Sequence, residues 1–410
     1  MSNTPVHTTE LNPDSCIACT ICQVHCPVAQ ASPHFLGPRL VGPAYERFRL
    51  LGLGEEESLH YCSNCKNCDI ACPHDVPISA FNMRARAAQS VRVKPPFRDW
   101  ILGHGETIAK LLRFVPAFCK NLGMLNPLTR HMLSLLGISP QAPLPAFAPK
   151  SFRAQYKHHA PNRTTPQDSG KIVVFFPGCY IDTYDPRTGL DMVWLLEKAG
   201  YTVIVPDSFV CCGLPMVANG FWEDAHQNAR RNVSIMQHYA AQNIPVVTGC
   251  PSCALMFNSD IPEYFPDLIT AEHTCLRMED AQSFLWRCVS TGQLALKAQS
   301  TKPLKVMYHA PCHLRAQGIA LPGLELLQAL PNVHALDAHA GCCGISGSYG
   351  FKKEKYPIGM QVGAELFSTL RASQADYAAS ECGTCRLQMR HGAHLTSLHP
   401  VSIIREVLEG

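Results

Sequence analysis

The chain has 410 residues, of which 46% are hydrophobic, so we expect two or three folded domains rather than one core. Its 21 cysteines are too many for chance, but the opening residues MSNTPVHTTELNPDS contain no apolar export signal, which argues against a secreted disulfide framework and for a reduced compartment. The net charge is only +3, and no stretch approaches the ~20 apolar residues that a membrane-spanning helix requires.

The first segment, residues 1–90, contains two cysteine motifs of the form C-x2-C-x2-C-x3-C-P. In bacterial ferredoxins three closely spaced thiolates hold one [4Fe–4S] cubane, while the fourth cysteine, before proline, binds the other cluster. Zinc sites favour separate C-x2-C pairs instead of this rhythm. The spacing therefore predicts two cubanes with crossed ligands. One set is Cys16, Cys19, Cys22 and Cys72, and the other is Cys62, Cys65, Cys68 and Cys26.

The second segment, residues 91–168, is expected to be a basic, helical connector. Between Arg84 and Arg163 there are 13 lysine and arginine residues but only two acids, Asp99 and Glu106. Apolar residues from Ile108 to Leu122 follow helical spacing, and Pro116 should either kink this helix or divide it into two shorter ones. The pattern is typical of a helix lying on a membrane surface, with an acidic partner protein, a solvated basic face or ordinary core packing as alternatives. Nucleic acid is not expected as a partner.

The third segment, residues 169–410, contains an internal repeat, at about 169–300 and 301–410. Each half begins with a strand-like run that ends in cysteine, KIVVFFPGC and LKVMYHAPC. Each continues with helical stretches, a Cys-Cys-Gly triplet and a strand leading into Cys-x-x-Cys. Strands that alternate with helices predict parallel sheets, and ligands gather at the carboxyl ends of such strands. We therefore predict an α+β chain: a ferredoxin-like domain with helices, then a duplicated α/β Cys-Cys-Gly domain. PNRTTPQDSG, at 161–170, is expected to be a linker.

Each repeat supplies five candidate metal-binding thiolates. Adjacent cysteines do not easily bind one zinc ion together, whereas a multi-iron cluster offers several metal corners. Glycine after the pair allows an unusual backbone conformation or a close approach to a cluster. We expect one or two iron–sulphur clusters here, with zinc in one repeat as the alternative. The candidate ligands are Cys179, Cys211, Cys212, Cys250 and Cys253 in the first repeat, and Cys312, Cys342, Cys343, Cys382 and Cys385 in the second.

These motifs resemble the Cys-Cys-Gly domains of heterodisulfide reductase B subunits, glycolate oxidase iron–sulphur subunits and some succinate:quinone reductase subunits. That resemblance implies non-cubane [4Fe–4S] clusters. Over nearly its whole length the chain is similar to the family of C subunits of anaerobic glycerol-3-phosphate dehydrogenases, as seen in GPRLVGPAYERFRL, CCGLPMVANGF and CCGISGSYGFKKEKYP. The resemblance implies that a flavin-containing A/B pair oxidises the substrate. This chain would then carry the electrons to membrane quinone, often menaquinone, at the cytoplasmic face of the inner membrane.

The chain itself is not expected to be the catalyst, because it lacks the G-x-G-x-x-G fingerprint of a flavin site. GISGSYG at 344–350 has the wrong spacing. His309 and His313 flank Cys312 and could relay protons to a quinone or be structural. Two alternatives stay open: the Cys-Cys-Gly domain could itself reduce a disulfide or a quinone, or the chain could serve another 2-hydroxy-acid oxidase, for glycolate or lactate.

Overall fold

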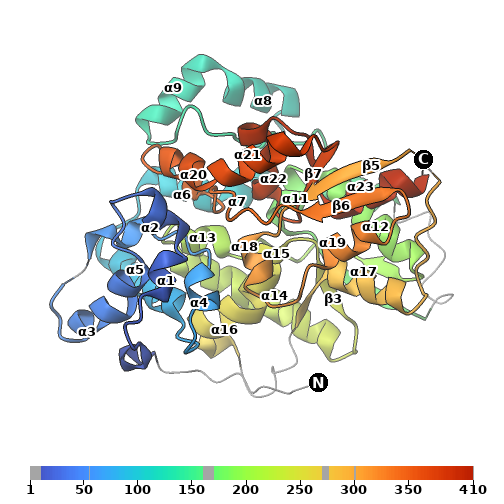
Figure 1. Ribbon diagram of the computed structural model, residues 1–410. Coiled ribbons are helices and arrows are strands. Elements are labelled where there is room, and N and C mark those ends of the chain that lie inside the picture. Colours follow the sequence, from blue (N-terminus) through green and yellow to red (C-terminus); the bar gives the residue numbers. More distant parts are fainter. Residues whose placement is uncertain (1–10, 55, 160–169, 270–276, 300–301, 410) are drawn as a thin grey trace.

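Short helices surround the two ferredoxin motifs in the computed structural model, which describes residues 11–54, 56–159, 170–269, 277–299 and 302–409 (Figure 1). Phe81 and Met83 are fully buried, and Met83 reaches the core of the first Cys-Cys-Gly repeat, so this segment is packed onto the rest of the chain. The helices are α1 (Ile21–Val24), α2 (Pro27–Ala31), α3 (Tyr45–Leu50), α4 (Asn67–Ile70) and α5 (Ile78–Arg92).

Five helices follow in the basic segment: α6 (Phe97–Gly103), α7 (Gly105–Leu111), α8 (Ala117–Leu125), α9 (Pro127–Leu135) and α10 (Phe152–His159). Pro116 precedes the first residue of α8, where its missing N–H costs nothing, so of the two predicted outcomes the division into two helices is confirmed. Helices α8 and α9 project from the body of the molecule (Figure 1), whereas Phe152 of α10 belongs to the main core. The linker predicted at 161–170 lies, except for Gly170, outside the described residues.

Each repeat folds into a four-stranded parallel sheet, and the two sheets have the same strand order, β2-β1-β3-β4 and β6-β5-β7-β8. The central strand β1 has the sequence IVVFF, and its last four residues are buried, as expected for a strand covered on both faces. The predicted duplicated α/β architecture is confirmed.

The first repeat consists of β1 (Ile172–Phe176), α11 (Gly178–Thr183), α12 (Pro186–Lys198), β2 (Thr202–Ile204), α13 (Leu214–Ala218), α14 (Trp222–Ala240), β3 (Val246–Thr248), α15 (Pro251–Leu255), α16 (Ile261–Tyr264), β4 (Met278–Asp280) and α17 (Ala281–Ser290). The second consists of β5 (Leu304–Tyr308), α18 (Cys312–Arg315), α19 (Pro322–Gln328), β6 (Val333–Asp337), α20 (Tyr356–Val362), α21 (Ala364–Ser373), β7 (Tyr377–Ala379), α22 (Gly383–Ala393), β8 (Ser397–Leu398) and α23 (Pro400–Glu409).

The two repeats pack against each other through equivalent helices. Helix α12, which precedes the second strand of its sheet, contacts α23, the last helix of the other repeat, and α19 contacts α17 in the same way. This exchange of equivalent partners is the pattern of a two-fold interface, here within one chain. The side chains between them form one apolar cluster that includes Leu195, Phe284, Leu327 and Ile404. The repeats therefore share a core.

Candidate metal centres

All six cysteine motifs of the third segment follow the carboxyl ends of strands. In the first repeat Cys179 follows β1, Cys211 and Cys212 follow β2, and Cys250 follows β3. The second repeat places its cysteines after β5, β6 and β7 in the same way. Because parallel strands end at one edge of the sheet, residues far apart in sequence meet there, at the point where the strand order reverses. The fold thus gathers five thiols at one edge of each sheet.

The adjacent cysteines of each triplet point to different partners, and both repeats use the same scheme. The first cysteine of the pair approaches the strand-end cysteine: the Sγ atoms of Cys211 and Cys179 are 3.7 Å apart. In the second repeat Cys342 and Cys312 are 3.5 Å apart. Thiolates bound to one metal at about 2.3 Å lie roughly 3.8 Å apart, so these spacings suit shared metal binding.

The second cysteine of each triplet approaches the Cys-x-x-Cys motif. Cys343 Sγ lies 3.1 Å from Cys385 Sγ. In the first repeat Cys212 interacts with both Cys211 and Cys253. Cys211 raises the pKa of Cys212 well above its usual value, and Cys253 opposes that rise. Each triplet thus bridges two groups of thiols.

Glycine is needed at the third position of each triplet for two reasons: the backbone conformation there and the closeness of a neighbouring helix. Gly213 and Gly344 have φ of 93° and 83°, the left-handed region that favours glycine. A Cβ on Gly344 would lie 1.9 Å from the carbonyl oxygen of Gly359 in α20, and one on Gly213 would lie 3.3 Å from Ala225 in α14. The unusual backbone conformation that the sequence predicted is therefore present, and each glycine also lies against a helix.

The first Cys-Cys-Gly site is attached directly to helix α7. The Glu106 carboxylate of α7 accepts a hydrogen bond of 2.6 Å from the backbone N–H of Cys211. Its other oxygen pairs with Lys110 at 2.7 Å. From the opposite side, the Asn232 amide of α14 donates to the carbonyl oxygen of Cys211. These contacts hold the triplet loop beneath α7.

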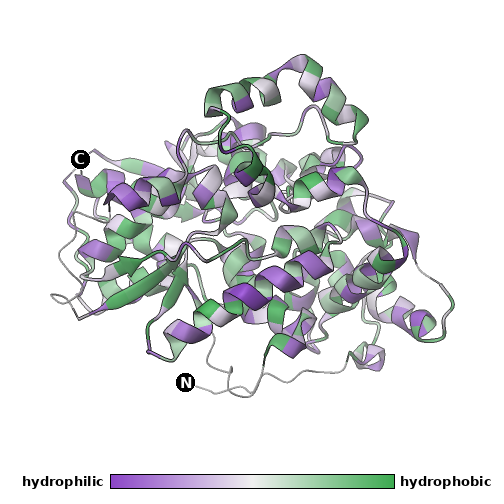
Figure 2. Cartoon of the chain, turned by 180° about the vertical axis from the view of Figure 1, so that it is seen from behind, coloured by the Kyte–Doolittle hydropathy of each residue, from purple (hydrophilic) through white to green (hydrophobic). Residues whose placement is uncertain are grey.

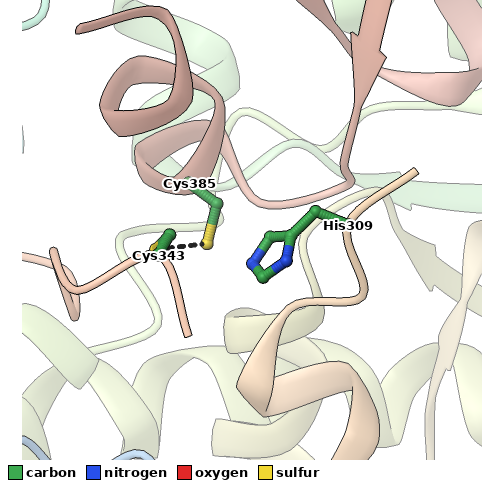
Figure 3. A group of neighbouring side chains, drawn as sticks. All are labelled: His309, Cys343 and Cys385. Atoms are coloured by element: carbon green, nitrogen blue, oxygen red, sulfur yellow. Dashed lines mark hydrogen bonds between the residues drawn. The ribbon is translucent and has the colours of Figure 1, made fainter. Parts of the chain in front are cut away.

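Two histidines flank Cys312, and the structure separates their roles. His313 uses both ring nitrogens: Nδ1 lies 2.9 Å from Ser252 Oγ, and Nε2 lies 3.1 Å from the carbonyl oxygen of Asn64. It therefore joins the ferredoxin segment to both repeats. His309 is buried beside Cys343 and Cys385, with ligand atoms of all three within 4.8 Å of one another (Figure 3). Burial lowers the pKa of His309 to about 4, so its ring is neutral at pH 7.

Both ferredoxin loops use the same backbone device. Two non-glycine residues in each loop have positive φ, Ala18 and Thr20 in the first and Asn64 and Lys66 in the second. Alternating right- and left-handed residues turn successive N–H groups inward, an arrangement that binds anionic centres such as iron–sulphur clusters. Such residues cost about 1–2 kcal/mol each, so their recurrence at matching places indicates a shared ligand.

The ferredoxin cysteines gather in two groups that cross between motifs. Cys72 joins the first motif, and together these four cysteines line a small cavity. Burial and then Cys16, Cys72 and Cys19 raise the pKa of Cys22 to about 11, because several thiolates in one place repel one another. The Cys62 charge likewise raises the pKa of Cys26, although burial contributes more. Cationic iron would relieve this repulsion, so the residues fit the clusters.

The second ferredoxin motif lies against the second Cys-Cys-Gly site. Burial and then the charge of Cys312 raise the pKa of Cys65. One guanidinium nitrogen of Arg315 lies 3.4 Å from Asn67 Oδ1 and 3.6 Å from Cys312 Sγ, and so bridges the two sites. Nearby, the buried Lys66 ammonium pairs with the buried Asp260 carboxylate at 2.9 Å.

The two Cys-Cys-Gly sites also adjoin each other. Cys253 lowers the pKa of Cys250, while burial and the charge of Cys382 in the other repeat oppose that change. Cys382 is thus an electrostatic neighbour of the first site. Cys22 likewise acts on the pKa of Cys26. By these electrostatic neighbours the cysteine groups follow one another in the order Cys16 group, Cys62 group, second Cys-Cys-Gly site and first.

Helices α7, α8 and α9 contain no buried residue. Of the predicted stripe, Leu111, Phe118 and Leu122 are exposed by 71%, 74% and 56%, while Ile108 and Leu112 are half-buried. Figure 2 shows apolar residues along the projecting helices α8 and α9. The prediction left open whether this stripe is core, and the structure answers that it is surface. Among the described residues, no helix is long and apolar enough to cross a bilayer. We call the surface of these three helices the apolar face.

Sequence reasoning did not find Glu106 as a contact of the first site, and it treated His309 and His313 alike. Glu106 stands out in the sequence only as one of two acids in a basic segment. That imbalance was the available signal, since a lone acid among cations often has a specific partner.

Two family models match the chain. A 4Fe–4S dicluster domain matches residues 12–76, and a cysteine-rich domain matches twice, at 173–258 and 306–390. The matches cover both ferredoxin motifs and both repeats, so this is an iron–sulphur protein with a ferredoxin-type domain and two Cys-Cys-Gly domains.

Three relatives indicate how the domains are combined. The chain is 25% identical to the B subunit of the fumarate reductase (CoM/CoB) of Methanothermobacter marburgensis over 95% of its length and 70% of that protein. It is 28% identical to lactate utilization protein A of Anoxybacillus flavithermus over 52% of its length and 87% of that protein. It is 34% identical to the C subunit of the anaerobic glycerol-3-phosphate dehydrogenase of Escherichia coli strain K12, over 96% of this chain and 98% of that one. The chain therefore belongs to the family of anaerobic glycerol-3-phosphate dehydrogenase C subunits.

Proposed function

We propose that this chain is the electron-transfer subunit of a glycerol-3-phosphate dehydrogenase and carries electrons from the ferredoxin segment to the apolar face. The observation that carries the proposal is the series of four cysteine groups. Cys65 adjoins Cys312, Cys382 adjoins Cys250, and Cys211 is hydrogen-bonded to α7. A catalyst needs one site open to substrate, whereas a relay needs neighbouring centres in a row.

In this proposal each cysteine group holds one centre. Two cubanes take the crossed sets, the Cys16 group with Cys72 and the Cys62 group with Cys26. Two non-cubane [4Fe–4S] clusters take the five cysteines of each repeat, with zinc in one repeat as the alternative. When bound, the clusters supply one-electron transfer. The protein contributes the thiolates, the positive-φ turns of the ferredoxin loops and a largely buried environment.

The electron donor is proposed to be a flavoprotein A/B pair, and the acceptor a membrane quinone such as menaquinone. The family supports this, since a similar protein is named as one of the subunits of a dehydrogenase. The chain has no flavin fingerprint of its own. Electrons would enter at the Cys16 group, whose Cys19 is exposed, and leave from the first Cys-Cys-Gly site.

The apolar face is proposed to dock peripherally on the membrane surface. Arg113 lies over the ring of Phe114, which is 83% exposed, so a cation borders an exposed apolar side chain. Lys120 of α8 lies over the buried ring of Phe147 instead. Apolar residues that enter the headgroup region while cations meet anionic lipid are the features of an interfacial helix. Docking here would bring the first Cys-Cys-Gly site to the quinone, because Glu106 joins that site to α7.

Single-turnover kinetics test the relay. The full-length chain, reduced by a chemical donor under anaerobic conditions, is mixed with a water-soluble menaquinone analogue, and both cubanes are followed by EPR. We expect the cubanes to reoxidise in the parent. Cys211→Ser should slow this at least tenfold, because it removes a ligand between them and the quinone. Cys288→Ala is the matched control, since Cys288 is a cysteine of α17 that lies outside every motif and outside the apolar face. Equal rates in parent and Cys211→Ser would overturn the relay.

One observation favours a second function, reduction of a disulfide at the Cys-Cys-Gly domain. The Cys-Cys-Gly repeats resemble those of heterodisulfide reductase B subunits, and the chain spans 70% of a relative from Methanothermobacter marburgensis named as the B subunit of a fumarate reductase (CoM/CoB). Steady-state assays of the chain alone, with a chemical donor and a disulfide, separate the two functions. Sustained turnover of disulfide without quinone would favour this second function.

A further inference from the structure

His309 is buried, and its ring nitrogen Nε2 has no hydrogen-bond partner among the described residues. It follows the last residue of β5 and is 2% exposed. Figure 3 shows the imidazole directed toward the sulphur atoms of Cys343 and Cys385. A buried polar atom without a partner costs about 1–3 kcal/mol. We therefore expect Nε2 to contact a bound group that is not part of the polypeptide.

The first repeat has no histidine at the equivalent position. Because the domain is duplicated, equivalent positions can be identified by counting back from the strand-end cysteine. His309 stands three residues before Cys312, and Phe176 stands three residues before Cys179. Phe176 is fully buried and packs edge-on against Phe209 and Phe257, with ring centroids 5.0 and 5.3 Å away. The equivalent place is therefore filled by hydrocarbon in one repeat and by a ring nitrogen in the other.

We propose that the imidazole of His309 binds the metal centre of the second Cys-Cys-Gly site, which then has sulphur and nitrogen ligands, whereas the first site has sulphur alone. This inference rests on metal occupancy of the second site, but not on the relay. The ligand atoms of His309, Cys343 and Cys385 lie within 4.8 Å of one another, close enough to share one metal ion or one cluster.

A difference in ligands would make the two sites electrochemically unequal. The imidazole adds a neutral nitrogen ligand to the five thiolates of the second site, whereas the first site has thiolates alone. Because ligand type tunes the potential of an iron–sulphur centre, the two sites should differ in reduction potential. The duplicated domain would thus hold two centres of different character.

Pulsed EPR of the reduced, full-length chain tests the ligand. The protein is prepared once with natural histidine and once with ¹⁵N-histidine. We expect a strong nitrogen coupling on a non-cubane signal, which changes with the isotope and is lost in His309→Phe, the residue type of the first repeat. The control is His313→Gln, because His313 bonds Ser252 and Asn64 instead, and it should keep the coupling. If His309→Phe does not fold, His309→Cys supplies another ligand and should fold without nitrogen coupling.

If the second site holds zinc, X-ray absorption at the zinc edge replaces EPR, and one nitrogen neighbour lost in His309→Phe supports the inference. A shell of sulphur alone, or a coupling unchanged in His309→Phe, would overturn it. The outcomes also separate this inference from the relay. A nitrogen ligand in a chain that does not reduce quinone refutes only the relay, and quinone reduction by a chain without the nitrogen ligand refutes only the inference.

Discussion

At the scale of single residues, the crossed ferredoxin ligands make a direct prediction. Cys72 lies with Cys16, Cys19 and Cys22, so Cys72→Ser should damage the cluster of the first motif and spare that of the second. Cys26→Ser should do the reverse. EPR of each variant, reduced under anaerobic conditions, gives the answer. Loss of the cluster beside the mutated residue in sequence, with the distant one intact, would mean that the ligands do not cross.

The residue scale also shows where sequence reasoning stops. Cysteine spacing predicts the two groups because the ligand geometry of a cubane demands it. Spacing cannot distinguish His309 from His313, since both flank Cys312. The difference arises from partners distant in sequence: Asn64 and Ser252 occupy both nitrogens of His313, while Nε2 of His309 finds none among the described residues.

Asp280 yields a prediction about pH and stability. Asp280 is the N-cap of α17, and its carboxylate accepts hydrogen bonds from the N–H groups of Gln282 and Ser283. Burial raises the pKa of Asp280 to about 6, against about 3.9 in an unfolded chain. Because the folded state holds the proton more tightly, the free energy of unfolding should fall as pH rises from about 4 to 6, and then level off.

Asp280→Asn should therefore stabilise the protein by about 1–2 kcal/mol at pH 7.5, and by less at pH 5.5. Asparagine keeps the oxygen that caps α17, and its amide can face the buried Oε1 of Gln282, which lacks a hydrogen-bond partner in the described structure. Thermal unfolding of the anaerobic protein at both pH values measures this. Asp280→Ala is the control, since it removes the cap as well and should gain about 1 kcal/mol less. An equal effect at both pH values would count against the raised pKa.

At the scale of elements, the apolar face predicts membrane binding. Leu125→Ser combined with Leu128→Ser and Leu135→Ser should abolish flotation with anionic vesicles while leaving thermal stability nearly unchanged, because these side chains are exposed. Arg113→Glu with Lys120→Glu should weaken binding in low salt. The matched control replaces Leu51, Leu53 and Leu336, which are exposed on other elements, and should float like the parent. If the two triple variants float equally well, the membrane contact does not lie on the apolar face.

The helical stripe was predictable, but its surroundings were not. Pro116 divides α7 from α8 because proline lacks an N–H and restricts the preceding residue, which is local chemistry. Whether the stripe is buried depends on what packs against it, and periodicity is the same for core and surface helices. The clustering of the cysteines, in contrast, was predictable. The alternation of strands and helices predicted parallel sheets, and the strands of a parallel sheet bring the cysteines at their carboxyl ends together.

At the scale of the whole molecule, a buried ion pair joins the ferredoxin segment to the first repeat. The side chains of Lys66 and Asp260 are 7% and 0% exposed. Burial alone would lower the pKa of Lys66, but Asp260 outweighs it and the pKa is raised. Asp260→Asn should destabilise the protein by about 3–5 kcal/mol, because it leaves a buried charge unpaired. Glu279→Gln is the control, since its partner Arg287 is 56% exposed and the pair is worth at most about 1 kcal/mol. Chemical unfolding under anaerobic conditions compares them, and similar losses would refute the docking role.

A Mössbauer spectrum of ⁵⁷Fe-enriched full-length chain tests the relay most directly, recorded after chemical reduction and again after mixing with excess water-soluble menaquinone analogue. The relay predicts iron in four centres, two cubanes and two Cys-Cys-Gly clusters, and all four should lose electrons on mixing. Iron confined to the cubanes, or Cys-Cys-Gly iron whose oxidation state does not change while the cubanes reoxidise, would contradict it.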